Sequence, residues 1–281
     1  MRVEELFAFI EERHKIYELK SDGVQKPWTD DPILRSYRFC NVYRQLDTET
    51  QWVYNNWGLP NEFDLDYWFA CAVFRLTNWH ETAEELGYPV PWNKAKFIRT
   101  LQRRKDGGEK VYSGAYTIST NGVAMEKHLY LAEQLSKLWK NRKLIRYIHG
   151  EPLREFHTRL KQYPCMGDFM AAQVVADMKQ VGEAATAPDK LTFASPGPGS
   201  KRGLNRVCGR HPDTPWRADS WLFMLTELHA RIKSRIKAAH MPFLDAQDLQ
   251  NCLCEFDKYE RVRLGEGRPR SKYNGDGYES I

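Results

Sequence analysis

The spacing of apolar residues constrains the fold most strongly, because it repeats every three to four positions through most of the chain. This spacing places the apolar side chains on one face of an α-helix and predicts a series of amphipathic helices. Glycine and proline interrupt the pattern and mark the helix ends. The predicted helices cover residues 3–19, 32–57, 64–86, 93–104, 125–149, 169–179, 216–239 and 244–261, and another begins at Pro152.

Two stretches depart from this pattern. Residues 109–120 alternate in a way that fits either a short hairpin or an irregular loop. Residues 182–200 are rich in Gly, Pro, Ala and Ser and form the longest segment predicted to be irregular. We therefore expect a mostly α fold, a single helical domain over residues 1–262 with at most a minor β-hairpin. A loose polar tail should follow at residues 263–281.

Composition excludes several classes of protein. No window approaches the run of about 18 apolar residues that a membrane span needs, and the N-terminus lacks the apolar stretch of a signal peptide. The six cysteines contain no CxxC pair and no nearby histidine pair at zinc spacing. We expect a cytoplasmic protein with reduced thiols, no bound metal and no membrane association.

The basic residues are clustered, although the net charge is only +5. A run of this kind can be simply the solvent-facing side of a helix. Several runs in one chain favour a polyanionic partner, because Lys and Arg that bind phosphates release counterions. From the first run we assign DNA contacts to Lys94, Arg99 and Arg103. The runs lie at residues 94–105, 137–146, 231–237 and 261–272.

The segment Tyr163-Pro-Cys-Met-Gly167 precedes a predicted helix. Gly167 would let the backbone turn tightly and leave N–H groups unpaired at the helix start. Such a helix start binds anions through its N–H groups and its dipole. We predict that Met166, Gly167 and Asp168 contact a DNA phosphate. The alternative is a plain tight turn between two packed helices.

A second candidate phosphate site is the segment 195–205, SPGPGSKRGLN, because successive exposed N–H groups can form an anion-binding nest. A flexible linker is the alternative interpretation. The segment is not a Walker A loop, since GxxxxGK[ST] occurs nowhere in the chain. The predicted phosphate-binding residues are Gly197, Gly199, Ser200, Lys201, Arg202 and Asn205.

Polar residues also recur at helical spacing within two predicted helices. Asn41, Arg44 and Asp47 would share one face of the helix over residues 32–57, where an internal ion pair of Arg44 is the alternative to a pocket. Gln173 and Asp177 form a similar pair on the helix after the hairpin, so the two sets could converge.

The segment 253–261, LCEFDKYER, places Glu255 before Lys258 and Asp257 before Arg261 at helical ion-pair spacing. Taken alone, this pattern favours a solvated helix.

Together, the segments RFCNVYRQLD, YPCMGDFMAAQVVADM, SPGPGSKRGLNR and LCEFDKYER resemble the helical domain of phage enzymes that hypermodify thymine in DNA. The resemblance spans residues 35–262. The family includes 5-hydroxymethyluracil DNA kinases and transferases called α-glutamyl/putrescinyl-thymine pyrophosphorylases. The hairpin is also similar to that of helix-hairpin-helix DNA glycosylases, whose fold we expect here. Those enzymes commonly place a catalytic Lys after the hairpin glycine, or an Asp further downstream. Here Asp168 and Phe169 follow the glycine, and residues 193–199 read FASPGPG, so both catalytic features look absent.

The resemblance implies an activity. Kinase members carry an added P-loop domain, which this sequence lacks, so the chain looks like a stand-alone transferase that acts after the kinase. Such a transferase replaces the phosphate of 5-phosphomethyl-deoxyuridine in double-stranded phage DNA with an amine. The donor would be a free amino acid such as glycine, which gives Nα-glycinylthymidine, or a polyamine such as putrescine. The modification would protect the phage genome from restriction in the host cytoplasm.

The chemistry suggests roles for the candidate residues. The enzyme must flip the base out of the duplex. Lys201, Arg202 and the glycine-rich backbone would neutralise the departing phosphate. Asp47 or Asp177 would accept the proton of the amine, and Arg44 would bind the carboxylate of an amino acid donor. The remaining substrate contacts are assigned to Asn41, Gln173, Asn205 and Lys258.

Phosphate is a good leaving group, so the reaction needs no metal or cofactor, and we expect none. Two other functions stay open, a helix-hairpin-helix DNA glycosylase and a non-catalytic DNA-binding partner of a hydroxymethyluracil DNA kinase.

Overall fold

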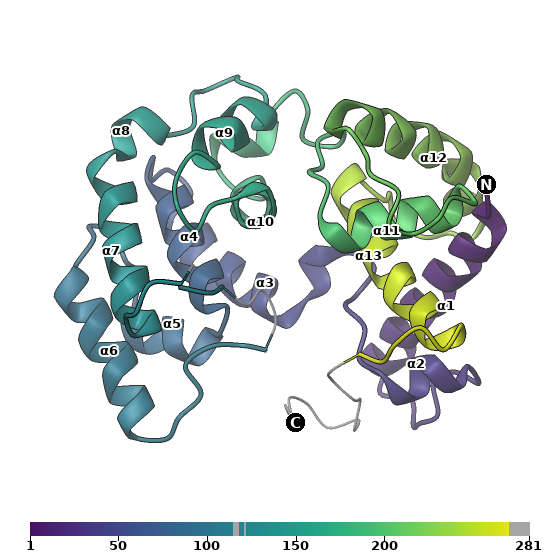
Figure 1. The fold of residues 1–281 in the computed structure, drawn as a ribbon, viewed down its shortest axis with the longest axis horizontal. Helices are drawn as coiled ribbons and strands as arrows, with labels where there is room; N and C mark the ends of the chain where they lie inside the picture. Colours follow the sequence, from purple (N-terminus) through teal and green to yellow (C-terminus); the bar gives the residue numbers. More distant parts are fainter. Residues whose placement is uncertain (115–117, 121, 270–281) are drawn as a thin grey trace. The chain divides into compact units, whose positions relative to one another are not determined.

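The computed structural model describes residues 1–114, 118–120 and 122–269, and the regular secondary structure in these ranges is helical (Figure 1). The predicted mostly α class is therefore confirmed. The chain divides into two compact units. Unit 1 combines Met1–Asp47 with Ala194–Ile281, and unit 2 is Thr48–Phe193. The similarity to the glycosylase fold and the grouping of residues 1–262 as one domain stay predictions.

Unit 1 has its own core, in which Trp221 and Phe256 are among the largest fully buried side chains. The long helices α12 and α13 pack against each other and against α1, and α11 packs closely on α13. The elements of unit 1 are α1 (Val3–Ser21), α2 (Pro32–Ser36), η1 (Arg44–Leu46), α11 (Pro198–Val207), α12 (Ala218–Ala238) and α13 (Ala246–Arg263).

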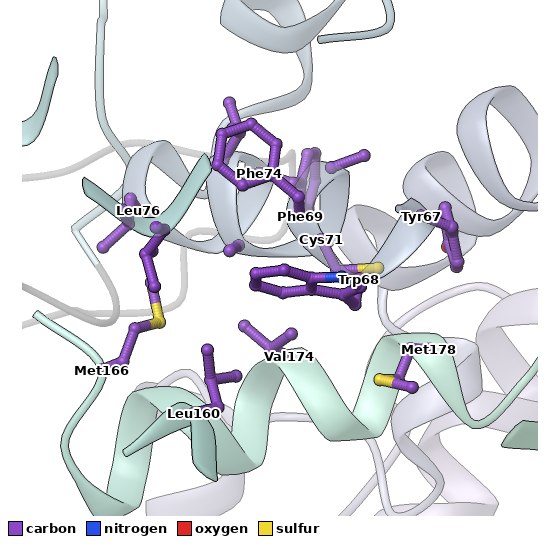
Figure 2. Close-up of a cluster of buried hydrophobic side chains, with 14 of the residues drawn as sticks. Tyr67, Trp68, Phe69, Cys71, Phe74, Leu76, Leu160, Met166, Val174 and Met178 are labelled. Atoms are coloured by element: carbon purple, nitrogen blue, oxygen red, sulfur yellow. The ribbon is translucent and has the colours of Figure 1, made fainter. Parts of the chain in front are cut away.

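Unit 2 is built around α4, which is buried along its whole length. Figure 2 shows the indole of Trp68 between α4 and α10, next to Val174. The elements of unit 2 are α3 (Thr48–Val53), η2 (Tyr54–Gly58), η3 (Leu59–Asn61), α4 (Tyr67–Thr77), α5 (His80–Leu86), α6 (Lys94–Asp106), α7 (Lys127–Lys140), α8 (Arg142–Ile145), α9 (Leu153–Leu160), α10 (Asp168–Met178) and η4 (Glu183–Thr186).

The predicted continuous helix over residues 32–57 is wrong. Helix α2 ends at Ser36, and residues 37–43 are not helical. Side chains of α13 bind the backbone of this segment in place of helical partners. The N–H of Cys40 donates to Glu255 over 3.1 Å, and the N–H of Arg44 donates to Asp248 over 3.0 Å. These bonds, to a helix some 200 residues away, satisfy backbone N–H groups that would otherwise need helical partners.

Other boundaries also differ from prediction. The helix expected over residues 125–149 is divided at Asn141 into α7 and α8. The Asn141 side chain donates to the carbonyl of Lys137 over 2.9 Å and so satisfies a carbonyl of the last turn of α7.

The strand candidate at 109–120 is not a strand in its described parts, 109–114 and 118–120, and residues 115–117 lie outside the described residues. The predicted tail lies outside them from residue 270 on. None of the helices in the described ranges is both long enough and apolar enough to cross a membrane.

The glycine-rich segment 195–205 is mostly helical, which overturns its prediction as an irregular phosphate loop. Helix α11 begins at Pro198. The glycines allow this helix to approach α13, because a Cβ at Gly199 would lie 2.4 Å from the Sγ of Cys254. A Cβ at Gly203 would lie only 2.0 Å from the carbonyl oxygen of Leu253. Close helix packing, rather than anion binding, therefore explains the glycines at 199 and 203.

We expect Gly203→Ala to destabilise the protein by about 1–3 kcal/mol or more, because α11 must move away from the α13 backbone. Urea unfolding measures the change. Gly114→Ala is the matched control, since a Cβ at Gly114 would have no neighbour within 4 Å among the described residues. Equal unfolding midpoints for Gly203→Ala and the unsubstituted protein would contradict this account of the glycine.

Candidate functional site

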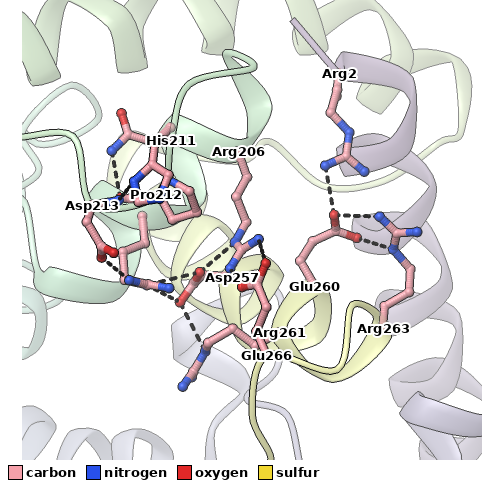
Figure 3. A network of polar contacts seen from close by, with 12 residues as sticks. Arg2, Arg206, His211, Pro212, Asp213, Asp257, Glu260, Arg261, Arg263 and Glu266 are labelled. Carbon is pink, nitrogen blue, oxygen red and sulfur yellow. Dashed lines mark hydrogen bonds and ion pairs between the residues drawn. The ribbon is translucent and has the colours of Figure 1, made fainter.

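A cluster of arginines surrounds the buried carboxylate of Asp257 on α13 (Figure 3). The Nε of Arg206 donates to Asp257 over 2.7 Å, and the Nε of Arg202 lies 3.3 Å from both carboxylate oxygens. The Nε of Arg261 forms a further ion pair with Asp257 at 3.3 Å. One buried carboxylate thus fixes side chains from α11 and α13.

The outer edges of these arginines meet more exposed acids. Arg202 pairs with Asp213, whose side chain is 66% exposed, and Arg206 pairs with Glu266, which is 39% exposed. Burial alone would lower the pKa of Arg206, but hydrogen bonds to Glu266 and Asp257 outweigh it and raise the pKa above its ordinary value. The Arg202–Asp213 pair is exposed and therefore contributes little stability, whereas the side chain of Arg206 is buried.

The other residues of the predicted phosphate loop have structural contacts. Ser200 is fully buried, and its hydroxyl accepts from the N–H of Gly197 over 3.0 Å at the start of α11. Asn205 is also fully buried and donates to the carbonyls of Pro212 and Thr214. Within the segment, Lys201 and Arg202 keep partly exposed side chains. The predicted nest is therefore replaced by a cluster in which Arg202 is the surface cation fixed on Asp257.

The predicted ion-pair spacings on α13 are confirmed. Lys258 pairs with Glu255 at 2.9 Å, and Arg261 pairs with Asp257 at 3.3 Å. The acidic partners are buried, so this face of α13 is not the solvated face that the pattern alone favours.

Asn41 and Asp47 lie together, although they are not on a helix. The N–H of Asn41 donates to a carboxylate oxygen of Asp47 over 3.1 Å, and its amide donates to the carbonyl of Leu46 over 2.8 Å. Asp47 is partly exposed, whereas Arg44 is buried. The helical stripe proposed for these residues is wrong, because the segment forms a loop on α13.

In unit 2, Asp177 forms a buried ion pair with Arg75. Its two oxygens accept from the Nε and the Nη2 of Arg75, each over 2.5 Å. Arg75 also donates to Thr50 and Asn78. Sequence reasoning missed Arg75, although a lone charged residue in the apolar sequence of α4 was a usable signal. Gln173 lies buried on the same helix as Asp177.

The turn before α10 has the expected open helix start. Gly167 is exposed, and no side chain caps the helix there. The left-handed residue of the turn is Cys165, with φ 67°, whereas Gly167 has φ −54°, so the predicted conformational reason for the glycine is wrong. Met166 is buried in the core, and Asp168 pairs with Lys161 at 3.0 Å. The DNA contact assigned to these residues stays a prediction.

Acidic residues pair with much of the basic run on α6. Lys94 pairs with Glu133 at 2.5 Å, and Arg103 pairs with Glu85 and Glu109. Arg99 is exposed and forms no ion pair with any residue in the described ranges. Three residues of this helix are assigned to DNA contacts, and two of them, Lys94 and Arg103, have acidic partners. Arg99 is therefore the one whose charge no acidic residue in the described ranges neutralises.

No group of His, Cys, Asp or Glu in the described part of the chain could hold a metal ion.

Comparison with known proteins places the chain in a family. The family model of the 5-hmdU DNA kinase helical domain matches residues 1–268, so the chain belongs to this family. It is also similar to a 5-hmdU DNA kinase of Bacillus phage SP10, with 27% identity over an alignment that covers 95% of this chain and 47% of the kinase. The chain thus spans about half the length of that relative. No solved structure matches it significantly.

We expect Asp177→Ala to cost about 3–5 kcal/mol, because it leaves the Arg75 charge buried without its carboxylate. Replacing both partners, with Arg75→Met and Asp177→Leu, should recover much of this loss. Guanidinium unfolding of the single and double variants measures both effects. A single variant as stable as the unsubstituted protein would show that the pair does not hold unit 2 together.

His157 predicts a pH dependence of stability. Burial lowers the pKa of His157 below its ordinary value, and its Nε2 lies 2.9 Å from the carbonyl oxygen of Asp168. Because the unfolded chain binds the proton more readily, stability falls as the pH drops below about 6.5. His157→Gln should lose less stability between about pH 7 and pH 5, since glutamine does not titrate. Thermal unfolding at both pH values tests this, and parallel losses in the two proteins would contradict it.

Proposed function

We propose that this chain is a DNA-modifying transferase that replaces the phosphate of 5-phosphomethyl-deoxyuridine with an amine. Family membership supports a role in thymine hypermodification, because the relative is named for a kinase that acts on 5-hmdU in DNA. The observation that carries the proposal is the arginine cluster, Arg202, Arg206 and Arg261, fixed on the buried Asp257.

The reaction is a substitution at the methylene carbon. The amine nitrogen donates its lone pair to form the C–N bond, and the C–O bond breaks with its electrons going to the phosphate. The nitrogen then loses a proton to a base. Guanidinium groups held in fixed positions would stabilise the charge on the departing phosphate, since they need no reorganisation as that charge develops. Asp257 provides this fixation for the cluster.

Asp47 is the better candidate for the base. Its carboxylate is partly exposed, whereas both oxygens of Asp177 accept from Arg75 in the core of unit 2. In this proposal Asp177 is structural and Asn41 orients Asp47 through its N–H. The role assigned to Arg44, binding the carboxylate of a free amino acid such as glycine, would require access to a side chain that is only 6% exposed.

Double-stranded DNA would bind through the open start of α10 at Gly167 and through Arg99. The start of α10 has no side-chain cap and its helix dipole favours a phosphate, and Arg99 adds a positive charge without an acidic partner in the described residues. Lys201 and Lys258 lie on the same helices as the arginine cluster and would extend it. The reaction would take place in the host cytoplasm on a flipped base.

A second candidate is a DNA-binding module that presents DNA to a separate kinase. It is favoured by the burial of Ser200, Asn205 and Asp177, whose polar groups are used inside the protein. DNA binding without any chemical change would distinguish this function from a transferase.

The test is mass spectrometry of nucleosides from phosphomethyluracil DNA incubated with the protein and a panel of amino acids and polyamines. We expect a mass shift with one class of amine. Asp47→Asn should reduce turnover by about 100-fold or more without loss of stability. Arg202→Ala should reduce both turnover and DNA affinity, because it removes a fixed guanidinium from the cluster.

Arg231→Ala is the matched control for Arg202→Ala. Arg231 is an exposed residue of α12, so its replacement changes the net charge equally and leaves the cluster intact. Equal losses in the two variants would overturn the role of Arg202. If no amine gives a mass shift while DNA still binds, the transferase proposal is wrong and the second candidate stands.

A further inference from the structure

A small pocket lies at the start of α4, and all the residues that line it belong to unit 2. Its volume is about 100 Å³, and its walls come from the segment before α4, from Tyr147 after α8 and from the segment after α10. The hairpin turn precedes α10 and the pocket follows it, so the two features lie at opposite ends of an 11-residue helix. A helix of this length is about 16 Å long.

The residues that line the pocket are aromatic, aliphatic or acidic. None of the described residues in its wall is Lys, Arg or His. Aromatic faces carry negative potential and attract cations, and carboxylates add full negative charges. The same wall repels phosphate. The aromatic members are Phe63, Tyr67, Trp68 and Tyr147, and the acidic members are Glu62, Asp64 and Glu183.

The structure fixes the carboxylate of Asp64 from two sides. One oxygen accepts from the hydroxyl of Tyr88 over 2.9 Å, and the other accepts from the N–H of Asp66 over 2.8 Å. Burial, and then the hydrogen bond to Asp64, raise the pKa of Tyr88 well above its ordinary value. Tyr88 therefore stays a hydrogen-bond donor, and Asp64 is held in place as the acid of the pocket wall.

The backbone also holds the walls together. Gly182 has φ +58° and approaches the carbonyl of Glu62 so closely that a Cβ there would lie 2.3 Å from its oxygen. Glycine is required by this contact and by the left-handed conformation. Figure 2 shows Tyr67 of α4 and Met178 of α10, which line the pocket, at the same end of the packed helices. The segments before α4 and after α10 are therefore in direct contact and form one continuous wall of the pocket.

We infer that this pocket binds a small organic ammonium ion. The ammonium group would lie against the aromatic faces within hydrogen-bond reach of Asp64, and a short carbon chain would contact the aliphatic wall. The pocket is small, at about 100 Å³, which favours a ligand of a few non-hydrogen atoms. A short diamine fits this chemistry, whereas the carboxylate of an amino acid would meet the acidic wall without a cationic partner.

General attraction of cations by the protein does not explain such binding, because the net charge of the chain is +5. The inference does not rest on the proposed transferase activity either, since binding is measured on the full chain without DNA. A negative transferase assay would not contradict ammonium binding in this pocket. Absence of ammonium binding would not contradict the phosphate role proposed for the arginine cluster.

Isothermal titration with putrescine, glycine, methylammonium and acetate tests the inference at constant ionic strength. We expect putrescine to bind with a Kd on the order of 1 mM or tighter, and methylammonium more weakly. Glycine should bind no better than methylammonium, because no cation in the wall pairs with its carboxylate. Acetate should not bind. Asp64→Asn should weaken ammonium binding by about tenfold, because asparagine keeps the hydrogen-bonding shape but not the charge. Binding by acetate, or none by any ammonium ion, would overturn the inference.

Phe63→Ala gives a second test that does not endanger folding, because this side chain is 87% exposed. It should weaken ammonium binding by removing an aromatic face. Phe223→Ala on α12 is its matched control, with a side chain that is 64% exposed and outside the pocket. Glu84→Gln is the charge control for Asp64→Asn. Binding that is unchanged in both pocket variants, or equally weakened in the controls, would show that the ligand binds elsewhere.

Discussion

The close packing of α11 on α13 is the constraint on which most of unit 1 depends. Gly203 lets the two backbones approach, because any side chain there would meet the carbonyl of Leu253. At this distance Arg202 and Arg206 of α11 reach the carboxylate of Asp257 on α13. Another face of α13 binds the loop that carries Asp47. A change in this packing would therefore move the arginine cluster together with its supporting carboxylate.

The two units solve the problem of buried charge in different ways. Unit 2 buries Asp177 with Arg75 and surrounds the pair with apolar side chains of α4 and α10. Unit 1 buries Asp257 together with Arg206, but its other two arginine partners, Arg202 and Arg261, keep edges towards solvent. Only the second arrangement leaves charge accessible to an external anion. This difference separates a structural ion pair from a candidate binding site even though both involve Asp and Arg at helical positions.

The sequence predicted what depends on local spacing. The helical class, the turn before Asp168 and the pair of Glu255 with Lys258 follow from periodicity and from neighbours within one helix turn. The loop at 37–47 did not follow, because its hydrogen-bond partners lie on α13, some 200 residues away. The glycines at 199 and 203 were misinterpreted, since close helix packing and phosphate binding favour the same residue. Arg75 was overlooked because its partners come from separate helices.

The pairing of each cluster arginine with a carboxylate has a consequence for how a polyanion would bind. A bare arginine surface holds mobile counterions, and their release makes DNA affinity fall steeply as salt rises. Here Asp213 and Glu266 already occupy the outer edges of Arg202 and Arg206. An incoming phosphate would exchange with these side chains and return them to water, so fewer ions would be released per contact. The DNA affinity of this surface would therefore fall less steeply with salt concentration than its number of arginines suggests.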